Sequence, residues 1–224
     1  MSTLTLVIGN KNYSSWSLRP WILLKHLGID FQEQIIPLFQ PGSREEMLKC
    51  GPSGKVPMLR QGGLCIWDSL AICEYISEIS GRGWPKDPAA RAVARSVSAE
   101  MHSGFANLRN QWPMNSRAHN RHVPMTSTLK ADVERVEEIW ADCRARFGTD
   151  GSPWLFGEYS IAYAMYAPVV LRFNTYGWPM GPPGTQFRDA TRDYMKAVLE
   201  DPPMREWLEA AKGETWTIET SEVG

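Results

Sequence analysis

Residues 11–21, KNYSSWSLRPW, place hydroxyl groups next to a predicted helix start. A proline fits in the first turn of a helix, where backbone N–H groups have no partner. We therefore expect the helix to start no earlier than Ser17 as its N-cap, with Pro20 at its third position. Ser14 and Ser15 then lie just ahead of the helix, where hydroxyl groups, backbone N–H groups and the helix dipole can bind an anion. Serines that only cap and turn the chain explain this segment equally well.

Two later segments contain further candidate ligand-binding residues. In PSGKVP, Pro57 follows Val56 at the start of a predicted strand. A proline there removes a donor from the sheet, and indicates a sheet edge, a cis bond or backbone that faces a ligand. In WDSLAICEYI, Asp68 and Ser69 precede another predicted helix, where ordinary capping is the alternative to ligand binding.

The first 80 residues alternate between strand-like and helix-like patterns, which suits a small mixed sheet with helices packed on it. The expected elements are a strand at 4–8, a helix at 18–27, a strand at 31–38, a short helix that runs from a Ser43–Glu46 capping box to residue 49, two strands within 56–67 around Gly62–Gly63, and a helix that starts after Ser69 and ends before Gly81.

The segment GRGWPKDP, residues 81–88, is rich in glycine and proline and is typical of a linker. Beyond it the pattern is helical throughout. The expected helices are 89–111, 127–147, 160–175, 186–200 and 203–212. The sequence therefore predicts an α/β domain over residues 1–82 and an all-α domain over residues 89–224.

Composition narrows the class of protein. Hydrophobic residues make up 43% of the chain, so it can bury a core without disulfides. A formal net charge of −1 argues against a dedicated nucleic-acid or membrane-surface binder. No apolar run approaches the roughly 18 residues of a membrane span, and the first residues lack a targeting pattern, so we expect a soluble, cytoplasmic protein.

The residues that most often bind metals do not form a pattern here. The four cysteines make no C-x-x-C pair and no zinc spacing, and we expect free, mostly buried thiols. His119 and His122 lie three positions apart without an evident third ligand, so no metal site is expected.

Taken together, these segments resemble the glutathione S-transferase superfamily over nearly the whole chain. PSGKVPML is similar to the family's stretch before its cis-proline, DSLAICEYI to its Glu/Asp-Ser-x-Ala-Ile-x-x-Tyr-Leu motif, and SIAYAMYAP to its helix-capping motif. SSWS resembles the Ser-Ser-Cys-Ser turn of zeta-class members, and NKNYSSWSLRPW and SAEMHSGF resemble bacterial members. The resemblance implies a thioredoxin-like first domain, a helical second domain, a homodimer, glutathione as co-substrate and a role in detoxification.

The resemblance also implies that the hydroxyl of Ser14 or Ser15 donates to the glutathione sulfur. We favour Ser15, which lies closer to the helix. If neither serine donates to the sulfur, Tyr13 is the remaining candidate. A free thiol has a pKa of about 8.5, and lowering it by about two units requires about 2.7 kcal/mol of preference for the anion. A charge-assisted hydrogen bond contributes about 1.5–3 kcal/mol and the helix dipole about 0.3–1 kcal/mol, which together are sufficient.

The rest of glutathione would bind along the first domain. By resemblance, the backbone of Val56 pairs with the cysteinyl part beside Pro57, and Asp68 and Ser69 hold the γ-glutamyl end. The remaining residues of the expected glutathione site are Trp16, Gln40 and Lys55, the last two at the glycyl end.

The electrophile is expected against the first long helix of the second domain and the loop that follows it. The candidate residues are Met101, Phe105, Trp112 and Met114, for which core packing is the alternative explanation. Arg109 and Arg117 can recognise an acidic substrate or can simply form a solvated helix face. Arg172 lies near, but not at, the position of the carboxylate clamp in zeta-type enzymes.

Two departures from the family pattern bear on function and stability. Trp16 replaces the zeta-class cysteine, which favours a glutathione transferase over a zeta-type isomerase of a maleyl keto acid and disfavours disulfide chemistry. A member that binds glutathione or a protein without catalysis is a third hypothesis. Tyr163 replaces the aspartate of the capping motif, with Ser160 as the expected N-cap whose hydroxyl accepts the N–H of residue 163. Tyrosine cannot complete such a capping box, so Tyr163→Asp is expected to raise the melting temperature, unless the ring packs into the core or against a partner subunit, in which case the melting temperature falls.

Overall fold

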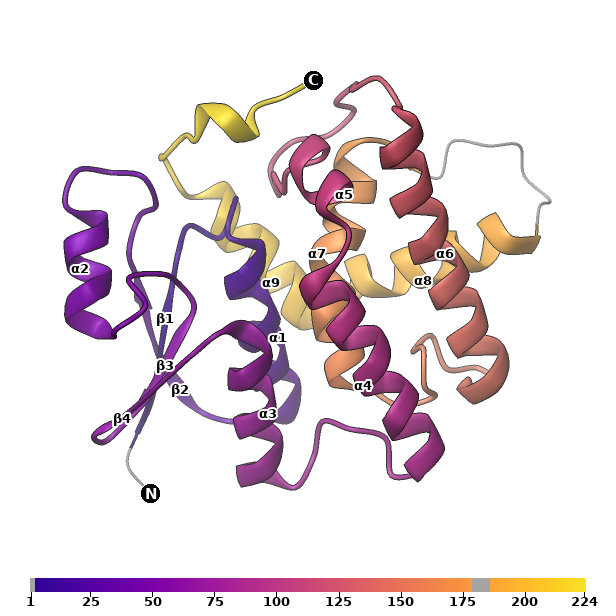
Figure 1. The fold of residues 1–224 in the computed structure, drawn as a ribbon, viewed down its shortest axis with the longest axis horizontal. Helices are drawn as coiled ribbons and strands as arrows, with labels where there is room; N and C mark the ends of the chain where they lie inside the picture. Colours follow the sequence, from indigo (N-terminus) through magenta and orange to yellow (C-terminus); the bar gives the residue numbers. More distant parts are fainter. Residues whose placement is uncertain (1–2, 179–185) are drawn as a thin grey trace.

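The computed structural model describes residues 3–178 and 186–224. A four-stranded mixed sheet forms one side of the molecule, in the order β2-β1-β3-β4 (Figure 1). Strand β1 pairs in parallel with β2 and antiparallel with β3, and β3 pairs antiparallel with β4. The strands are β1 (Leu4–Ile8), β2 (Phe31–Ile35), β3 (Met58–Gln61) and β4 (Leu64–Trp67).

Three helices cover this sheet: α1 (Ser15–Leu27), α2 (Ser43–Cys50) and α3 (Ser69–Ser80). Because side chains alternate along a strand, β1 sends Leu6 and Ile8 into the main core with α1 and α3. It sends Val7 to the other face, where Val7 packs with Met47 of α2 and Met58 of β3. Helix α2 thus lies on one side of the sheet, and α1 and α3 lie between the sheet and the helical region (Figure 1).

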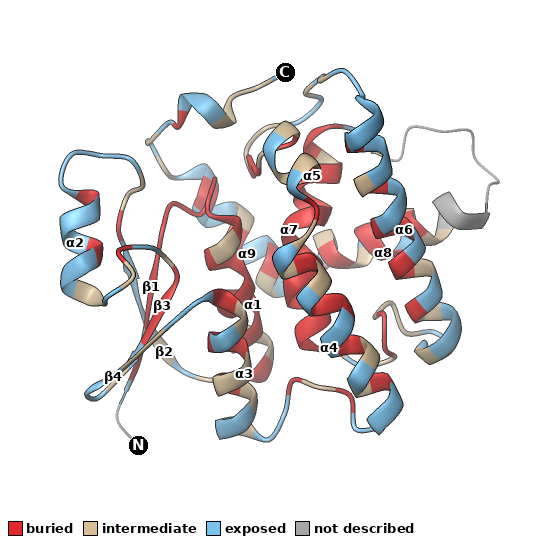
Figure 2. Ribbon diagram, viewed as in Figure 1, coloured by how far each residue is buried: buried red, intermediate tan, exposed pale blue. Residues whose placement is uncertain are grey.

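The helical region consists of α4 (Pro88–Ser103), α5 (Ala106–Gln111), α6 (Ser127–Phe147), α7 (Ile161–Thr175), α8 (Gln186–Glu200) and α9 (Pro202–Lys212), followed by a 3₁₀ turn at Glu219–Ser221. Helix α7 is buried along nearly its whole length, at the centre of this region (Figure 2). It packs against both α1 and α4, so one continuous core joins the sheet region to the helices. The predicted fold class, a thioredoxin-like region followed by a helical one, is confirmed.

The first helix begins earlier than the proline rule predicted. The carbonyl of Ser14 accepts the N–H groups of Ser17 (3.1 Å) and Leu18 (3.2 Å), which places the N-cap at Ser14. Pro20 is therefore the sixth residue of α1 and lies inside the helix. The prediction of Ser17 as N-cap was wrong, because burial of α1 against its neighbours stabilises a helix that lacks one N–H donor.

Three other expectations about helix ends were wrong. Ser43 is the first residue of α2 and does not form a capping box, because its hydroxyl donates to the carbonyl of Pro37. The helix expected over 89–111 breaks into α4 and α5, where Phe105 adopts a left-handed conformation (φ 56°). Ser160 is the N-cap of α7, as predicted, but the expected hydroxyl bond is absent and its carbonyl instead accepts the N–H of Tyr163 at 3.0 Å.

None of the helices within the described ranges is long and apolar enough to cross a membrane. All four cysteines are free, as predicted. Cys73 and Cys143 are buried, whereas Cys50 and Cys65 are only partly buried.

Candidate functional site

The two candidate serines at the start of α1 have different partners. The Ser14 hydroxyl lies 2.7 Å from that of Ser17, which also accepts the N–H of Gly9 at 3.1 Å, so Ser14 belongs to a closed network within the turn. The Ser15 hydroxyl oxygen instead accepts a hydrogen bond from Nη2 of Arg172, at 3.2 Å. A guanidinium only donates, so the Ser15 proton remains available for an acceptor in the site. Ser15 is also the first residue of α1, at the positive end of its dipole.

Arg172 was not assigned to this turn by the sequence. It lies on α7, 157 positions along the chain from Ser15, and its other contacts are the carbonyls of Trp112 (2.8 Å) and Pro168 (3.2 Å). Burial, and then the nearby Arg109, lower the pKa of Arg172 to about 10. That value is still above neutral pH, so Arg172 is a cation when it contacts Ser15.

Tyr13 is engaged elsewhere. Its hydroxyl donates to Oε1 of Glu222 at 2.6 Å and accepts from Nη2 of Arg117 at 3.0 Å. Arg117 also donates to the backbone carbonyls of Glu214 and Trp216. Both residues therefore fasten the C-terminal segment to the turn, and Arg117 is not a freely solvated side chain.

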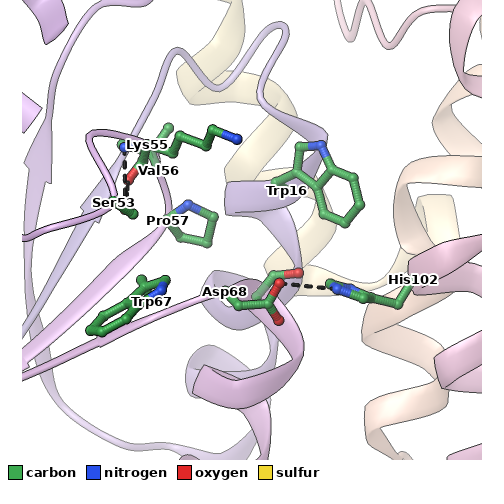
Figure 3. Close-up of a pocket in the computed structure, with 9 residues that line it drawn as sticks. Trp16, Ser53, Lys55, Val56, Pro57, Trp67, Asp68 and His102 are labelled. Carbon is green, nitrogen blue, oxygen red and sulfur yellow. Dashed lines mark hydrogen bonds and ion pairs between the residues drawn. The ribbon is translucent and has the colours of Figure 1, made fainter.

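A cavity of about 450 Å³ lies at the N-terminus of α3 (Figure 3). It is lined by Trp16, Ser53, Lys55, Val56, Pro57, Trp67, Asp68, Ser69 and His102. The Val56–Pro57 peptide bond is cis. Six of the seven expected glutathione-site residues of the first domain thus line one cavity, and the seventh, Gln40, does not. Gln40 is exposed in the loop before α2, where its N–H donates to the Ser43 hydroxyl.

Asp68 and Ser69 present different groups to this cavity. Asp68 is the N-cap of α3, and its Oδ1 accepts the N–H groups of Leu70 (2.9 Å) and Ala71 (3.3 Å). The Ser69 side chain is buried, and its hydroxyl has no hydrogen-bond partner among the described residues. A buried hydroxyl without a partner is costly, so Ser69 is suited to bind a polar ligand group in the cavity.

His102 is a site residue that sequence reasoning missed. Its Nε2 lies 3.0 Å from Oδ2 of Asp68, and its ring packs edge-on against Trp16, with the ring centroids 5.3 Å apart. Figure 3 shows His102 reaching from α4 toward Asp68, beside Trp16. The contact crosses between the sheet region and the helices, and no local motif around residue 102 indicates it.

A larger cavity of about 630 Å³ adjoins the first and shares Trp16, Lys55 and Val56 with it. Its lining residues are Tyr13, Ser14, Ser15, Trp16, Leu38, Phe39, Met47, Gly54, Lys55, Val56, Ala106, Arg109, Asn110, Pro113, Met114, Arg172 and Ser221. This cavity therefore places both serines opposite α5 and the loop that follows it.

Of the four expected electrophile residues, only Met114 lines this cavity. The other three, Met101, Phe105 and Trp112, are buried in the hydrophobic core. Core packing, the alternative explanation for these residues, therefore holds for them. Side chains that point away from the core at the same segment, such as Arg109 and Asn110, form the wall instead.

Comparisons with known proteins point to one family. Residues 13–79 match the family model described as glutathione S-transferase, N-terminal domain. A rat maleylacetoacetate isomerase is 29% identical over 174 residues, which are 75% of this chain and 77% of the rat protein. A mouse maleylacetoacetate isomerase is 38% identical over 101 residues, which are 43% of this chain and 46% of the mouse protein.

Solved structures share the fold. A glutathione transferase homolog from Burkholderia, with bound glutathione, superposes with a TM-score of 0.66 at 20% identity, over 96% of this chain and 100% of that one. A glutathione transferase from Pseudomonas putida, with one glutathione disulfide bound per subunit, gives a TM-score of 0.66 at 19% identity, over 93% and 91% of the two chains. At these identities the likeness concerns the fold alone.

Proposed function

We propose that this chain is a glutathione transferase of the glutathione S-transferase superfamily, in which Ser15 stabilises the glutathione thiolate. The family-model match over residues 13–79, the similarity to the rat protein and the shared fold support this proposal. The observation that carries the proposal is the Ser15 hydroxyl. It faces the larger cavity from the first residue of α1, and Arg172 occupies its oxygen while its proton is free to donate. The thiolate then attacks a small electrophile in the same cavity.

The proposed position of glutathione follows the two adjoining cavities. The γ-glutamyl end binds at Asp68 and Ser69 in the smaller cavity, where a carboxylate can pair with the ligand's ammonium group and an unpartnered hydroxyl can bind its carboxylate. The cysteinyl part lies along the backbone of Val56, which lines both cavities. Lys55, rather than the exposed Gln40, is the proposed partner of the glycyl carboxylate.

The energetics agree with this assignment. A hydrogen bond from Ser15 to the charged sulfur contributes about 1.5–3 kcal/mol, and the dipole of α1 about 0.3–1 kcal/mol. One pKa unit corresponds to 1.36 kcal/mol, so together they lower the thiol pKa by about one to three units. A thiol with a pKa between about 5.5 and 7.5 has a large thiolate fraction at neutral pH.

The proposal is tested by calorimetry with glutathione and with S-alkylated glutathione, followed by a screen of electrophiles. We expect both ligands to bind, because the larger cavity leaves room beyond the sulfur. We also expect glutathione-dependent turnover of at least one aryl halide, peroxide or epoxide. Absence of binding at millimolar glutathione would contradict the proposal.

A second candidate is a zeta-type, glutathione-dependent isomerase of a maleyl keto acid. The rat and mouse relatives, which carry that name, favour it, whereas Trp16 at the position of the zeta-class cysteine disfavours it. The two activities differ in stoichiometry, because a transferase consumes one glutathione per turnover and an isomerase consumes none. Measuring free thiol during turnover of a maleyl keto acid therefore separates them.

The proposal also includes a cytoplasmic homodimer that acts in detoxification, as the family resemblance implies. Light scattering coupled to size-exclusion chromatography tests the dimer. A mass that corresponds to a single 25.3 kDa chain would contradict it.

A further inference from the structure

Two arginines are buried beside the Ser15 turn, and within the described residues no ion pair joins either of them to an acidic side chain. Arg19 of α1 is 2% exposed and Arg172 of α7 is 4% exposed. Nε and Nη1 of Arg19 have no hydrogen-bond partner within the described part of the chain. Burial, and then Arg172, lower the pKa of Arg19 to about 9, so it remains a cation at neutral pH. Burying a cation without a direct counter-ion costs folding free energy. Buried charges of this kind are concentrated in active sites, where they bind or stabilise an anion.

Trp16 brings this charge close to the proposed sulfur position. The guanidinium carbon of Arg19 lies 4.2 Å from the centroid of the Trp16 ring, and that of Arg109 lies 5.4 Å from it. Both distances suit cation–π contacts. Trp16 directly follows Ser15 in α1 and lines both cavities. The indole therefore holds two guanidinium groups next to the residue whose hydroxyl Arg172 contacts.

No acidic side chain offsets these charges within the larger cavity. Its described lining includes Lys55, Arg109 and Arg172 but no aspartate or glutamate. Asp68, in the smaller cavity, raises the pKa of Arg19 least among the groups around it, and its oxygens contact backbone N–H groups of α3 and His102 rather than a guanidinium. The cavity is thus cationic beside Ser15, and an anion bound there would be the missing counter-ion.

We propose that Arg19, Arg109 and Arg172 form one cationic cluster whose counter-ion is the glutathione thiolate at Ser15. This inference rests on the proposed function and adds residues to it. Arg172 is a positioning residue, because it occupies the Ser15 oxygen and turns the hydroxyl proton toward the sulfur. Arg19 and Arg109 act through their electric field. When the S–H bond breaks, the electron pair stays on the sulfur and the proton leaves to water, and the cluster stabilises the charge that remains.

The cluster also gives a reason for Trp16, which stands where the similar turn of zeta-class members has a cysteine. The indole faces carry guanidinium groups, which a cysteine side chain cannot do. In this chain, the charge that favours the thiolate thus comes from arginines of α1, α5 and α7 together.

The test is an ultraviolet titration of the bound glutathione thiol in Arg19→Met, Arg109→Met and Arg172→Met. Arg205→Met is the matched control, because Arg205 is an exposed arginine of α9 and its loss changes the net charge equally. Methionine preserves much of the side-chain volume, and replacing a buried charge by an apolar group is often neutral or stabilising. Melting temperatures and glutathione affinity verify that each variant is folded.

An opposite charge within several ångströms shifts a pKa by about 1–3 units. We expect the pKa of the bound thiol to rise by about 1 unit in Arg19→Met and in Arg109→Met, and by about 1–2 units in Arg172→Met, which also loses the contact with Ser15. The control should keep the wild-type value. These results would support the cluster as the counter-charge of the thiolate.

Two results would overturn the inference while leaving the proposed function intact. The first is a wild-type thiol pKa in folded Arg19→Met and Arg109→Met. The second is an unchanged thiol pKa together with a raised KM for carboxylate-bearing electrophiles only, which would assign the cluster to the co-substrate. If the wild-type protein itself binds no glutathione, the proposed function fails first.

Discussion

Tyr163 is the residue at which the structure reverses a prediction from the sequence. Its side chain is buried, and its ring packs against Trp154 and Tyr159, with ring centroids 4.7 Å away in both cases. Its hydroxyl donates to Oδ2 of Asp201 at 2.9 Å, and the same oxygen lies 2.6 Å from Nε2 of His26. Burial raises the pKa of the Tyr163 hydroxyl, so it remains a protonated donor. Tyr163 therefore joins α7 to the start of α9 instead of completing a cap.

The magnitude follows from these contacts. Tyr163→Asp removes a buried ring, which costs about 3–5 kcal/mol, and leaves a carboxylate at a buried position without a partner. For a protein of this size, each kcal/mol lowers the melting temperature by about 2–4 °C. We therefore expect a fall of at least about 6 °C. Tyr163→Phe keeps the ring and loses one hydrogen bond to a carboxylate, so we expect a loss of about 2 kcal/mol and a fall of about 4–8 °C.

The assay is thermal unfolding by calorimetry, with Tyr159→Phe as the matched control. The Tyr159 hydroxyl is buried and has no partner among the described residues, so its removal should leave the melting temperature unchanged or slightly higher. Glutathione affinity should stay at its wild-type value in all three variants. A melting temperature that rises in Tyr163→Asp would refute this reasoning and restore the capping interpretation.

Three further predictions concern the site and the thiols. Asp68→Ala should weaken glutathione binding and lower the melting temperature, because loss of the α3 cap costs about 0.5–2 kcal/mol of stability. Asp68→Asn keeps a capping oxygen, so it should weaken binding at little cost in stability. Calorimetry measures the binding and thermal unfolding the stability. His102→Gln should raise the glutathione dissociation constant by about tenfold or less, because it leaves Asp68 less firmly oriented; an unchanged constant would exclude this role. Burial raises the pKa of Cys143 to about 12 and raises that of Cys73 further, so neither forms thiolate at pH 8 and neither should react with a thiol reagent until the protein is denatured.

The sequence was most informative where a local rule decides the structure. Gly81 ends α3 because it adopts a left-handed conformation (φ 65°), which glycine tolerates, and the side chain of Asp68 caps the other end of this helix. The glycine pair at 62–63 separates β3 from β4 for the same kind of local reason. Such features depend on a few neighbouring residues and can be predicted from them.

The sequence was least informative where contacts join distant segments. Arg172 meets Ser15, and His102 meets Asp68, only because α7 and α4 pack beside α1 and α3. An apolar residue such as Met101 fits a core or a cavity wall equally well, so its burial could not be predicted from its type. The predicted start of α1 was wrong for a related reason. Tertiary packing compensates the free-energy cost of the hydrogen bond that Pro20 cannot donate.

The central claim, that Ser15 stabilises a glutathione thiolate, is tested most directly by the pKa of the bound thiol in the wild-type protein, Ser14→Ala and Ser15→Ala. Ultraviolet absorbance of the thiolate against pH gives this value. Desolvation of the bound thiolate raises its pKa and offsets part of what Ser15, the helix dipole and the arginines contribute. We predict a net wild-type pKa about two units below that of a free thiol, a rise of about 1–2 units in Ser15→Ala, and a smaller rise in Ser14→Ala, whose hydroxyl is tied to Ser17. A wild-type pKa in folded, glutathione-binding Ser15→Ala would contradict the account.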